Sequence, residues 1–436
     1  MASISQSLFS WQALDASSDI VRFQKMLDAL DDRELVEALE RERKGRRNDY
    51  PVAAMWNSLL AGHIFGHECT ASLIRELRRN AELRQVCGFD PLLNEKAVPT
   101  KDAYYRFFKK LERHLDLIMK IFHDLVNRLK QFLPDLGRHL AEDGKAVPSY
   151  RKDDLEAAVG RKESIGPDGV TKITFEWFGY KLHLLCDAEF ELPLAFVVTT
   201  ASEHESPHLM PLVEDFRNHH PAIIKDTETL AADKGLDKGE DKQRLYEEYG
   251  VMPLIPSREM KREYEPLEPS FHDAIYISPA GEVVCKTHPF EGADEKKYSR
   301  MAFMGFEKSR NSLKFRCPAA AYGIECKNRG ACRCSQRVME GNYGRVVRVP
   351  LDRDRRLFGP IYAHSYRFED LYKGRTSIER LFYRLDHLYG FERHTVRGLA
   401  RMQLRMAMAL TAMLATALGW VQADRVKDLR RRFQAA

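Results

Sequence analysis

The chain has 436 residues, of which 44% are hydrophobic and 31% charged, and its formal net charge is +5. These values are those of a soluble folded protein with room for two or three domains. Residues 1–18 lack a basic segment followed by an apolar run, and the longest apolar stretch, residues 406–421, is too short to span a membrane. We therefore expect a cytoplasmic protein without membrane association, whose eight cysteines are reduced thiols.

The small net charge gives no general electrostatic argument for nucleic-acid binding, but the basic residues are clustered. Taken singly, each cluster has the simpler interpretation of a solvated helix face, whereas several together favour contacts to phosphates. The clusters are residues 41–47; Arg75, Arg78, Arg79 and Arg84; Arg106, Lys109, Lys110 and Arg113; and Arg425, Lys427, Arg430, Arg431 and Arg432.

Residues 20 to 133 carry apolar side chains at helical spacing, and Pro134 ends the last of these segments. Short helices joined by polar turns, one of them with a basic face, favour a helix-turn-helix type of DNA-binding domain over residues 1–135. The alternative is a helical cap that only supports the domain that follows.

From residue 136 to residue 258 the pattern changes to short β-rich runs that alternate with helical connections, which predicts an α/β sheet. Two aspartates end apolar runs in this segment: Asp143 in HLAEDGK and Asp233 in LAADKGLD. We expect each to lie at the tip of a strand. The simpler interpretation of each, taken alone, is an aspartate that opens a turn.

Residues 259–365 are rich in turns and short strands, and they predict a β-rich insertion. Four cysteines fall within 18 residues of this segment, which suggests a structural zinc site. Their spacing is irregular and lacks paired CxxC knuckles, so reduced thiols in a loop-rich module are the alternative. The four are Cys317, Cys326, Cys332 and Cys334.

Residues 366–422 predict the closing helices of the α/β domain, followed by a basic tail over residues 423–436. Tyr372, Arg375 and Glu379 are spaced three and four apart, so on one helix they would share a face opposite an apolar stripe. Glu379 would then join Asp143 and Asp233 as a third acidic group. Three carboxylates on three elements suit a divalent-metal site for phosphoryl transfer.

These motifs resemble the DDE transposases of bacterial insertion sequences, in particular the insertion-sequence-four-like superfamily with a Y-x2-R-x3-E-x6-K signature. The resemblance covers roughly residues 20 to 420 and is carried, in the expected order, by GYKLHLLCD (179–187), LPLAFVVTTASEHES (192–206), ADKG (232–235), GVMPLIPSR (250–258), RTSIERLFYRL (375–385) and YGFERHTVRGLA (389–400). It implies an RNase H-like catalytic core. The final lysine of the signature falls at Asp386, which departs from the family pattern.

The resemblance implies a DNA transposase that acts on double-stranded DNA with terminal inverted repeats and on target DNA, as a homodimer on paired ends at the nucleoid. We expect Asp143 to bridge two Mg²⁺ or Mn²⁺ ions, with Asp233 and Glu379 each completing one site. Water would attack the phosphate for strand cleavage, and a DNA 3′-hydroxyl would attack it for joining.

Four side chains near Glu379 are candidates for DNA contacts. Arg375 and Tyr372 suit a backbone phosphate, although a salt bridge from Arg375 to Glu379 is the alternative. Arg384 or Arg393 would replace the contact of the missing lysine. Two other functions stay open: a catalytically impaired DNA-binding protein derived from a transposase, for which Asp386 is the motive, and an RNase H-fold nuclease without strand transfer.

Overall fold

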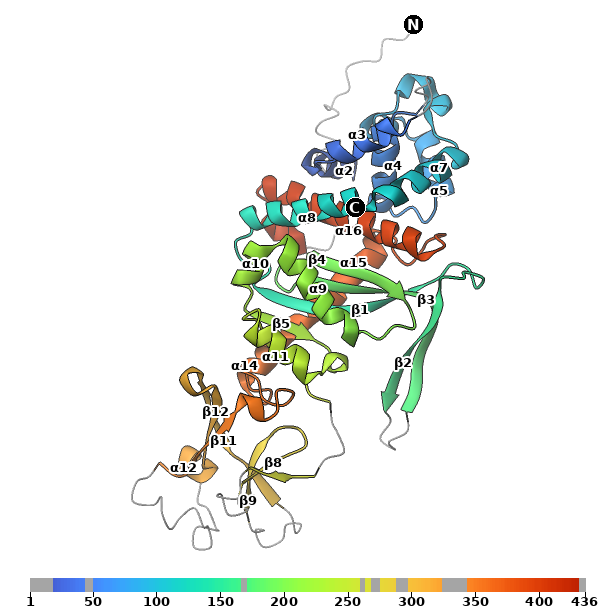
Figure 1. Ribbon diagram of the computed structural model, residues 1–436. Helices are drawn as coiled ribbons and strands as arrows, with labels where there is room; N and C mark the ends of the chain where they lie inside the picture. Colours follow the sequence, from blue (N-terminus) through green and yellow to red (C-terminus); the bar gives the residue numbers. More distant parts are fainter. Residues whose placement is uncertain are drawn as a thin grey trace. The chain divides into compact units, whose positions relative to one another are not determined.

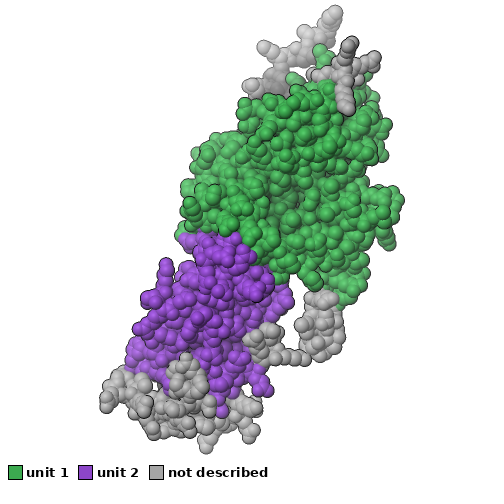
Figure 2. Space-filling view, viewed as in Figure 1, with its two compact units in different colours: residues 1–138, 143–226, 376–436 green, residues 139–142, 227–375 purple. Residues whose placement is uncertain are grey.

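A computed structural model describes residues 19–43, 50–165, 171–258, 263–267, 275–287, 297–323 and 343–430 (Figure 1). The chain divides into two compact units (Figure 2). The first comprises residues 1–138, 143–226 and 376–436, and the second comprises residues 139–142 and 227–375.

The described residues before the first strand are helical, as their periodicity predicts. The helices are α2 (Asp19–Ala29), α3 (Arg33–Arg41), α4 (Val52–Ile64), α5 (Thr70–Arg79), α6 (Ala81–Cys87), α7 (Lys101–Leu111) and α8 (Leu115–Phe132), with 3-10 turns η1 (Pro91–Ala97) and η2 (Glu112–His114).

These N-terminal helices share their core with the last long helix of the chain. Helix α16 (Leu399–Gln422) packs against α2, α4 and α8, and η8 (Val426–Arg430) follows it. A Cβ at Gly419 would lie 3.0 Å from the backbone oxygen of Lys25 in α2, so glycine permits this close approach. Of the described helices, α16 is long and apolar enough to cross a membrane, yet 94% of its most apolar window is buried inside the protein. It is a core helix, as expected from the sequence.

The central sheet is mixed, with the strand order β2-β3-β1-β5-β6 and β4 paired to β3. Strand β1 is parallel to β5, and β5 is parallel to β6. The pairs β2/β3 and β3/β4 are antiparallel. The strands are β1 (His139–Pro148), β2 (Ala158–Ile165), β3 (Thr171–Asp187), β4 (Pro193–Thr200), β5 (Thr229–Ala232) and β6 (Met252–Leu254).

Strand β1 also runs antiparallel to β3. The backbone N–H of Gly137, before β1, donates to the Asp187 carboxylate at the end of β3 (2.7 Å), and the N–H of Ser149, after β1, donates to the Phe178 carbonyl (2.8 Å). The path β4-β3-β1-β5-β6 therefore has three antiparallel strands followed by two that are parallel to β1. This confirms the α/β class, and it is the arrangement expected of an RNase H-like core.

Helices cover both faces of the first unit's part of the sheet. Glu205, just before α9 (Ser206–His219), lies so close to Gly144 of β1 that a Cβ on this glycine would meet its Oε1 at 2.6 Å. Since neighbouring residues of a strand point to opposite faces, Lys145 points the other way, where it contacts α15 (Thr376–Leu388). Figure 1 shows α9 in front of β1 and α15 behind it. Helix α10 (Pro221–Asp226) follows α9.

The second unit holds the β-rich segment predicted for residues 259–365. Its two sheets have the orders β10-β9-β8-β7 and β11-β12-β13, and Leu313, Phe315, Val347 and Val349 lie in their shared core. Its strands are β7 (Glu265–Pro266), β8 (Ile275–Ile277), β9 (Val283–Thr287), β10 (Lys297–Arg300), β11 (Ala302–Glu307), β12 (Ser312–Arg316) and β13 (Val346–Pro350). Its helices are α11 (Gly239–Glu247), α12 (Pro318–Tyr322) and α14 (Tyr366–Tyr372), with 3-10 turns η3 (Lys234–Leu236), η5 (Lys308–Arg310), η6 (Leu351–Arg353) and η7 (Lys373–Arg375).

Four buried histidines of the first unit give the fold a sensitivity to acid. Burial lowers the pKa of His63, His123, His183 and His220 to about 3. In the unfolded chain an imidazole titrates near pH 6.5, so between about pH 6.5 and pH 3 the unfolded state binds more protons than the folded state. The stabilisation that comes from keeping these imidazoles neutral is therefore fully present above about pH 6.5, and it is lost as the pH falls from about 6.5 toward 3.

We expect the free energy of unfolding to fall between pH 7 and pH 5.5, with each of these histidines contributing up to about 1.4 kcal/mol per pH unit. Urea denaturation at the two pH values measures this change. A His63→Gln variant should show a shallower pH dependence, whereas His204→Gln, at an exposed histidine, should keep the slope of the unaltered protein. Equal slopes in all three proteins would contradict the assignment to His63.

Candidate active site

Asp143 is the fifth of the ten residues of β1. The prediction that it lies at a strand tip is wrong, because β1 continues through Lys145 to Pro148. Its Oδ1 accepts the backbone N–H of Gly144 at 2.8 Å, which fixes the carboxylate beside the strand, and the residue is half-buried. The short apolar run HLA suggested a strand end, whereas the pairing of β1 with β3 carries the strand further.

Asp233 directly follows the last residue of β5, as the sequence predicts. Its Oδ1 accepts the backbone N–H of Lys234 at 2.7 Å, and the residue is exposed. In the parallel register of the two strands, Glu142 of β1 faces Ala232 of β5. The two aspartates are thus the residues that directly follow this matched pair in the chain.

Glu379 lies in the first turn of α15 and is exposed. Tyr372, Arg375 and Glu379 do not lie on one continuous α-helix, which corrects the prediction from their spacing. Tyr372 ends α14, Arg375 ends the 3-10 turn η7, and α15 begins at Thr376. Gly374 stands between the two segments, and a glycine is costly inside a helix, so the sequence held a sign of this break.

Lys145 connects β1 to α15 through side-chain contacts, and it was not identified from the sequence. Its Nζ lies 2.7 Å from Oδ2 of Asp386 and 2.8 Å from Oε1 of Glu392, and it is 5.8 Å from the centre of the Phe382 ring. Burial raises the pKa of Asp386, and the hydrogen bond from Lys145 acts against that rise. The position that departs from the family signature therefore carries an acid neutralised by a lysine of β1.

The same contacts show which face of β1 is turned toward α15, the helix that carries Glu379. Glu379, Phe382 and Asp386 are spaced three and four apart, so they form one stripe of α15. Asp143 and Lys145 are two apart, so they share one face of β1. Since Lys145 touches the stripe at Phe382 and Asp386, Asp143 lies on the face of the strand that is turned toward the Glu379 stripe.

A second contact places the start of α15 along the sheet. Ser377 Oγ lies 3.9 Å from Cys186 Sγ near the end of β3, and β3 runs antiparallel to β1. Helix α15 therefore meets the sheet at Ser377, near the beginning of β1, and again at Asp386, beside Lys145. In the sequence of α15, Glu379 lies between these two contacts.

The loop that carries Glu392 is fixed by hydrogen bonds from the buried Arg405. Arg405 of α16 donates Nη2 to the carbonyl oxygens of Gly390 (2.8 Å), Phe391 (3.5 Å) and Arg393 (3.3 Å). Burial lowers the pKa of Arg405 to about 10, which still leaves it charged at neutral pH. The second partner of Lys145 is thus positioned by the core of the first unit.

Two of the predicted DNA-contacting arginines have protein partners. Arg384 bonds to the carbonyl and carboxylate of Glu191 and to the Leu429 carbonyl, and its side chain is 12% exposed. These bonds give it a structural role in place of the predicted DNA contact. Arg393 is 78% exposed and lies 3.3 Å from Glu68, a surface pair of the kind that contributes little.

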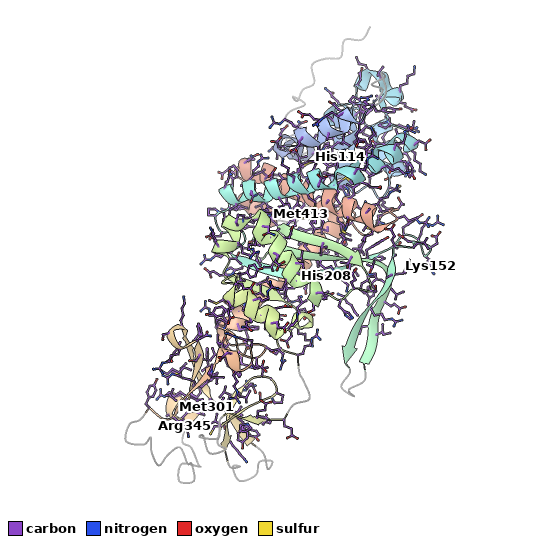
Figure 3. The ribbon with its side chains drawn as sticks, in the orientation of Figure 1. His114, Lys152, His208, Met301, Arg345 and Met413 are labelled. Atoms are coloured by element: carbon purple, nitrogen blue, oxygen red, sulfur yellow. The ribbon has the colours of Figure 1, made fainter. Side chains whose placement is uncertain are left out.

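The other predicted site residues lie in different parts of the structure. Tyr372 stacks on Phe368, with ring centres 5.7 Å apart, and Arg375 is half-buried. Cys317 is half-buried, whereas Cys326, Cys332 and Cys334 lie outside the described residues, as do residues 431–436 of the basic tail. His208, on α9 (Figure 3), bonds to Glu203 at 3.0 Å.

Two family models match parts of the chain. Residues 139–317 match the family described as Transposase DDE domain, and residues 11–110 match the Transposase domain (DUF772). No curated protein matches the chain. Among solved structures, a piggyBac transposase synaptic complex with hairpin DNA is similar at 10% identity and a TM-score of 0.39, over 96% of this chain and 77% of that one.

Proposed function

The chain is a DDE-type DNA transposase of the kind found in insertion sequences, and on that premise we propose that Asp143, Asp233 and Glu379 are its catalytic carboxylates. The observation that carries the proposal is the contact of Lys145 with Phe382 and Asp386. It supports a position of Asp143 opposite the stripe of α15 that bears Glu379. The match of the Transposase DDE domain includes both aspartates.

The donor set fits a hard divalent cation. All three candidates are carboxylates, and Asp233 and Glu379 are exposed. Like charges gathered at one place repel each other by a few kcal/mol per pair at an effective protein dielectric, which a cation would relieve. Oxygen donors favour Mg²⁺ or Mn²⁺ over softer metals. When bound, such ions supply Lewis-acid stabilisation of the charge that develops during phosphoryl transfer.

The protein's own contribution is to hold these oxygens and the DNA in place. The N–H groups of Gly144 and Lys234 fix one oxygen each of Asp143 and Asp233, and Lys145 keeps β1 against α15. In cleavage, water attacks the phosphorus and the 3′ oxygen of the DNA leaves. In joining, a DNA 3′-hydroxyl attacks a target phosphate and a target 3′ oxygen leaves. No covalent intermediate with a side chain is needed.

We assign Arg375, Tyr372 and Arg393 to contacts with DNA phosphates, as supporting rather than reacting groups. Residues 1–135 are proposed to bind the transposon ends, and the β-rich segment 259–365 is proposed to contribute further DNA contacts. The substrates are double-stranded DNA with terminal inverted repeats and a target DNA. Assembly as a homodimer on paired ends, at the nucleoid, belongs to the same proposal.

The structure supports an active enzyme over an impaired descendant. The reason to suspect impairment was an unpaired acid at position 386, where it would repel a phosphate. Asp386 is instead paired with Lys145 of β1, which balances its charge inside the protein. A nuclease without strand transfer is the second candidate function, since cleavage and joining use the same carboxylates.

One assay separates these functions. Purified protein is incubated in Mg²⁺ with a DNA duplex that carries the terminal repeat flanking the coding region, and in parallel with pre-cleaved ends and a target plasmid. We expect nicking of the first substrate and joined products from the second. Cleavage without joining would indicate a nuclease, and binding without either product would indicate an impaired protein.

A further inference from the structure

We propose a second metal site, for a Zn²⁺-like cation, formed by His123, Asp215 and His219 on the facing sides of α8 and α9. One ligand atom from each of the three lies within 4.8 Å of the others. All three belong to the first unit, and the Transposase DDE carboxylates are not among them. Two imidazoles and a carboxylate are a donor set that suits zinc, with a fourth position for water.

A hydrogen-bond chain fixes the tautomer of His123. The Asn127 amide donates its Nδ2 to the His219 carbonyl (3.3 Å), so its Oδ1 faces Nδ1 of His220 (2.7 Å). Because an amide oxygen only accepts, His220 carries its proton on Nδ1 and offers Nε2 as an acceptor. Nδ1 of His123 lies 3.0 Å from that Nε2 and must donate to it. The lone pair of His123 is therefore on Nε2.

This chain is the outer-shell pattern of a metal-binding histidine. In metal sites the ring nitrogen that does not bind the ion donates to a fixed acceptor, which orients the ring and sets its tautomer. His123 is 5% exposed and His220 is fully buried, so the relay belongs to the core and is rigid. A neutral imidazole with its proton on Nδ1 is the form that binds a metal ion through Nε2.

His219 and Asp215 bring the other two donors from α9. They are four residues apart on this helix, and Nδ1 of His219 lies 3.0 Å from the Asp215 carbonyl oxygen and 3.2 Å from its Oδ1. Donation to that carbonyl leaves the lone pair of a neutral His219 on Nε2. The His219 ring stacks on the His123 ring with centres 3.8 Å apart and planes 2° apart. Burial raises the pKa of the Asp215 carboxyl, and the nearby His219 opposes that rise.

The ligand atoms are slightly too far apart for a bound ion. Donors of a tetrahedral ion with bonds of about 2.0–2.1 Å are roughly 3.3 Å apart, whereas the three ligand atoms lie within 4.8 Å of one another, so the site would contract on binding. The side chain of His219 is 47% exposed and that of Asp215 is 38% exposed, so these two can move onto the fixed His123. Binding would join α8 to α9 and stabilise the first unit.

The test uses the full chain, stripped with a chelator and held in excess Mg²⁺ so that the carboxylates of the active site are occupied. Zn²⁺ is titrated in, and its binding is followed by calorimetry, metal analysis and thermal unfolding. We expect His219→Gln and Asp215→Asn to bind one equivalent fewer, or that equivalent at least 10-fold more weakly, and to lose the rise in melting temperature. His204→Gln, which removes an exposed histidine elsewhere, should behave as the unaltered protein.

Co²⁺ distinguishes this site from the cysteines. Cobalt at His123, Asp215 and His219 should give visible d–d bands without a thiolate charge-transfer band, and His219→Cys should add such a band. Zn²⁺ binding that is equal in all variants, or that is lost only on replacing Cys317, would overturn the proposal. A folded His219→Gln protein, checked by circular dichroism, excludes general unfolding as the cause of a loss.

Discussion

Asp143→Asn is expected to reduce DNA strand cleavage by on the order of 10³-fold or more, because a metal ligand supplies several kcal/mol of transition-state stabilisation. Asp233→Asn and Glu379→Gln should lose activity to a similar extent. Each substitution keeps the shape of the side chain and removes only its charge. Initial rates of nicking on a labelled terminal-repeat duplex, at several Mg²⁺ concentrations, measure the effect.

Binding of the transposon end should survive these substitutions, since carboxylates repel phosphates and their neutralisation removes no attractive contact. Asp226→Asn and Glu248→Gln serve as matched controls, because both carboxylates are paired at the surface and contribute little. Cleavage that stays within tenfold of the unaltered protein in any of the three variants would remove that residue from the catalytic set.

Lys145→Met is expected to lower both stability and cleavage. It leaves Asp386 half-buried without its cation, which costs about 1–3 kcal/mol. It also releases α15 from β1, and a displacement of about 1 Å at Glu379 would slow cleavage on the order of 100-fold. Urea denaturation and nicking rates measure the two effects.

Reversing the pair tests whether Lys145 acts by positioning. Lys145→Glu alone places a third acid beside Asp386 and Glu392 and should be worse than Lys145→Met. Adding Asp386→Lys restores an ion pair and puts a lysine at the place where the family signature has one. We expect the double variant to regain a cleavage rate within about tenfold of that of the unaltered protein, with a normal Mg²⁺ requirement, because the new ion pair holds α15 against β1 again. Recovery of stability with no recovery of cleavage would show that Lys145 has a more direct role.

The sequence predicted the class of the fold and the transposase family, because strand periodicity and local motifs are short-range properties. It did not predict that β1 extends past Asp143, since that depends on pairing with β3 over residues that are not apolar. Nor did it locate the break between Tyr372 and Thr376, where spacing alone was compatible with one helix.

Ion pairs between residues far apart in the chain could not be predicted from the sequence either. Lys145 and Asp386 are 241 positions apart, and Arg384 and Glu191 are 193 apart, so neither pair leaves a local pattern. Both concern charges that the sequence analysis interpreted from the missing lysine of the family signature. Asp386 was interpreted as a lost lysine, with Arg384 or Arg393 as its replacement, whereas in the fold Asp386 pairs with Lys145 of β1 and Arg384 pairs with Glu191 inside the first unit.

The packing of α16 against α2 and α8 has a consequence for handling the protein in pieces. A fragment ending near residue 135 would lose the helix that covers the apolar sides of its own helices, and we expect it to aggregate during expression. A fragment that begins near residue 135 would expose the apolar side of α16 that α2 and α8 cover. Experiments on end recognition therefore call for the intact polypeptide, or for a short fragment to which residues 399–422 have been fused.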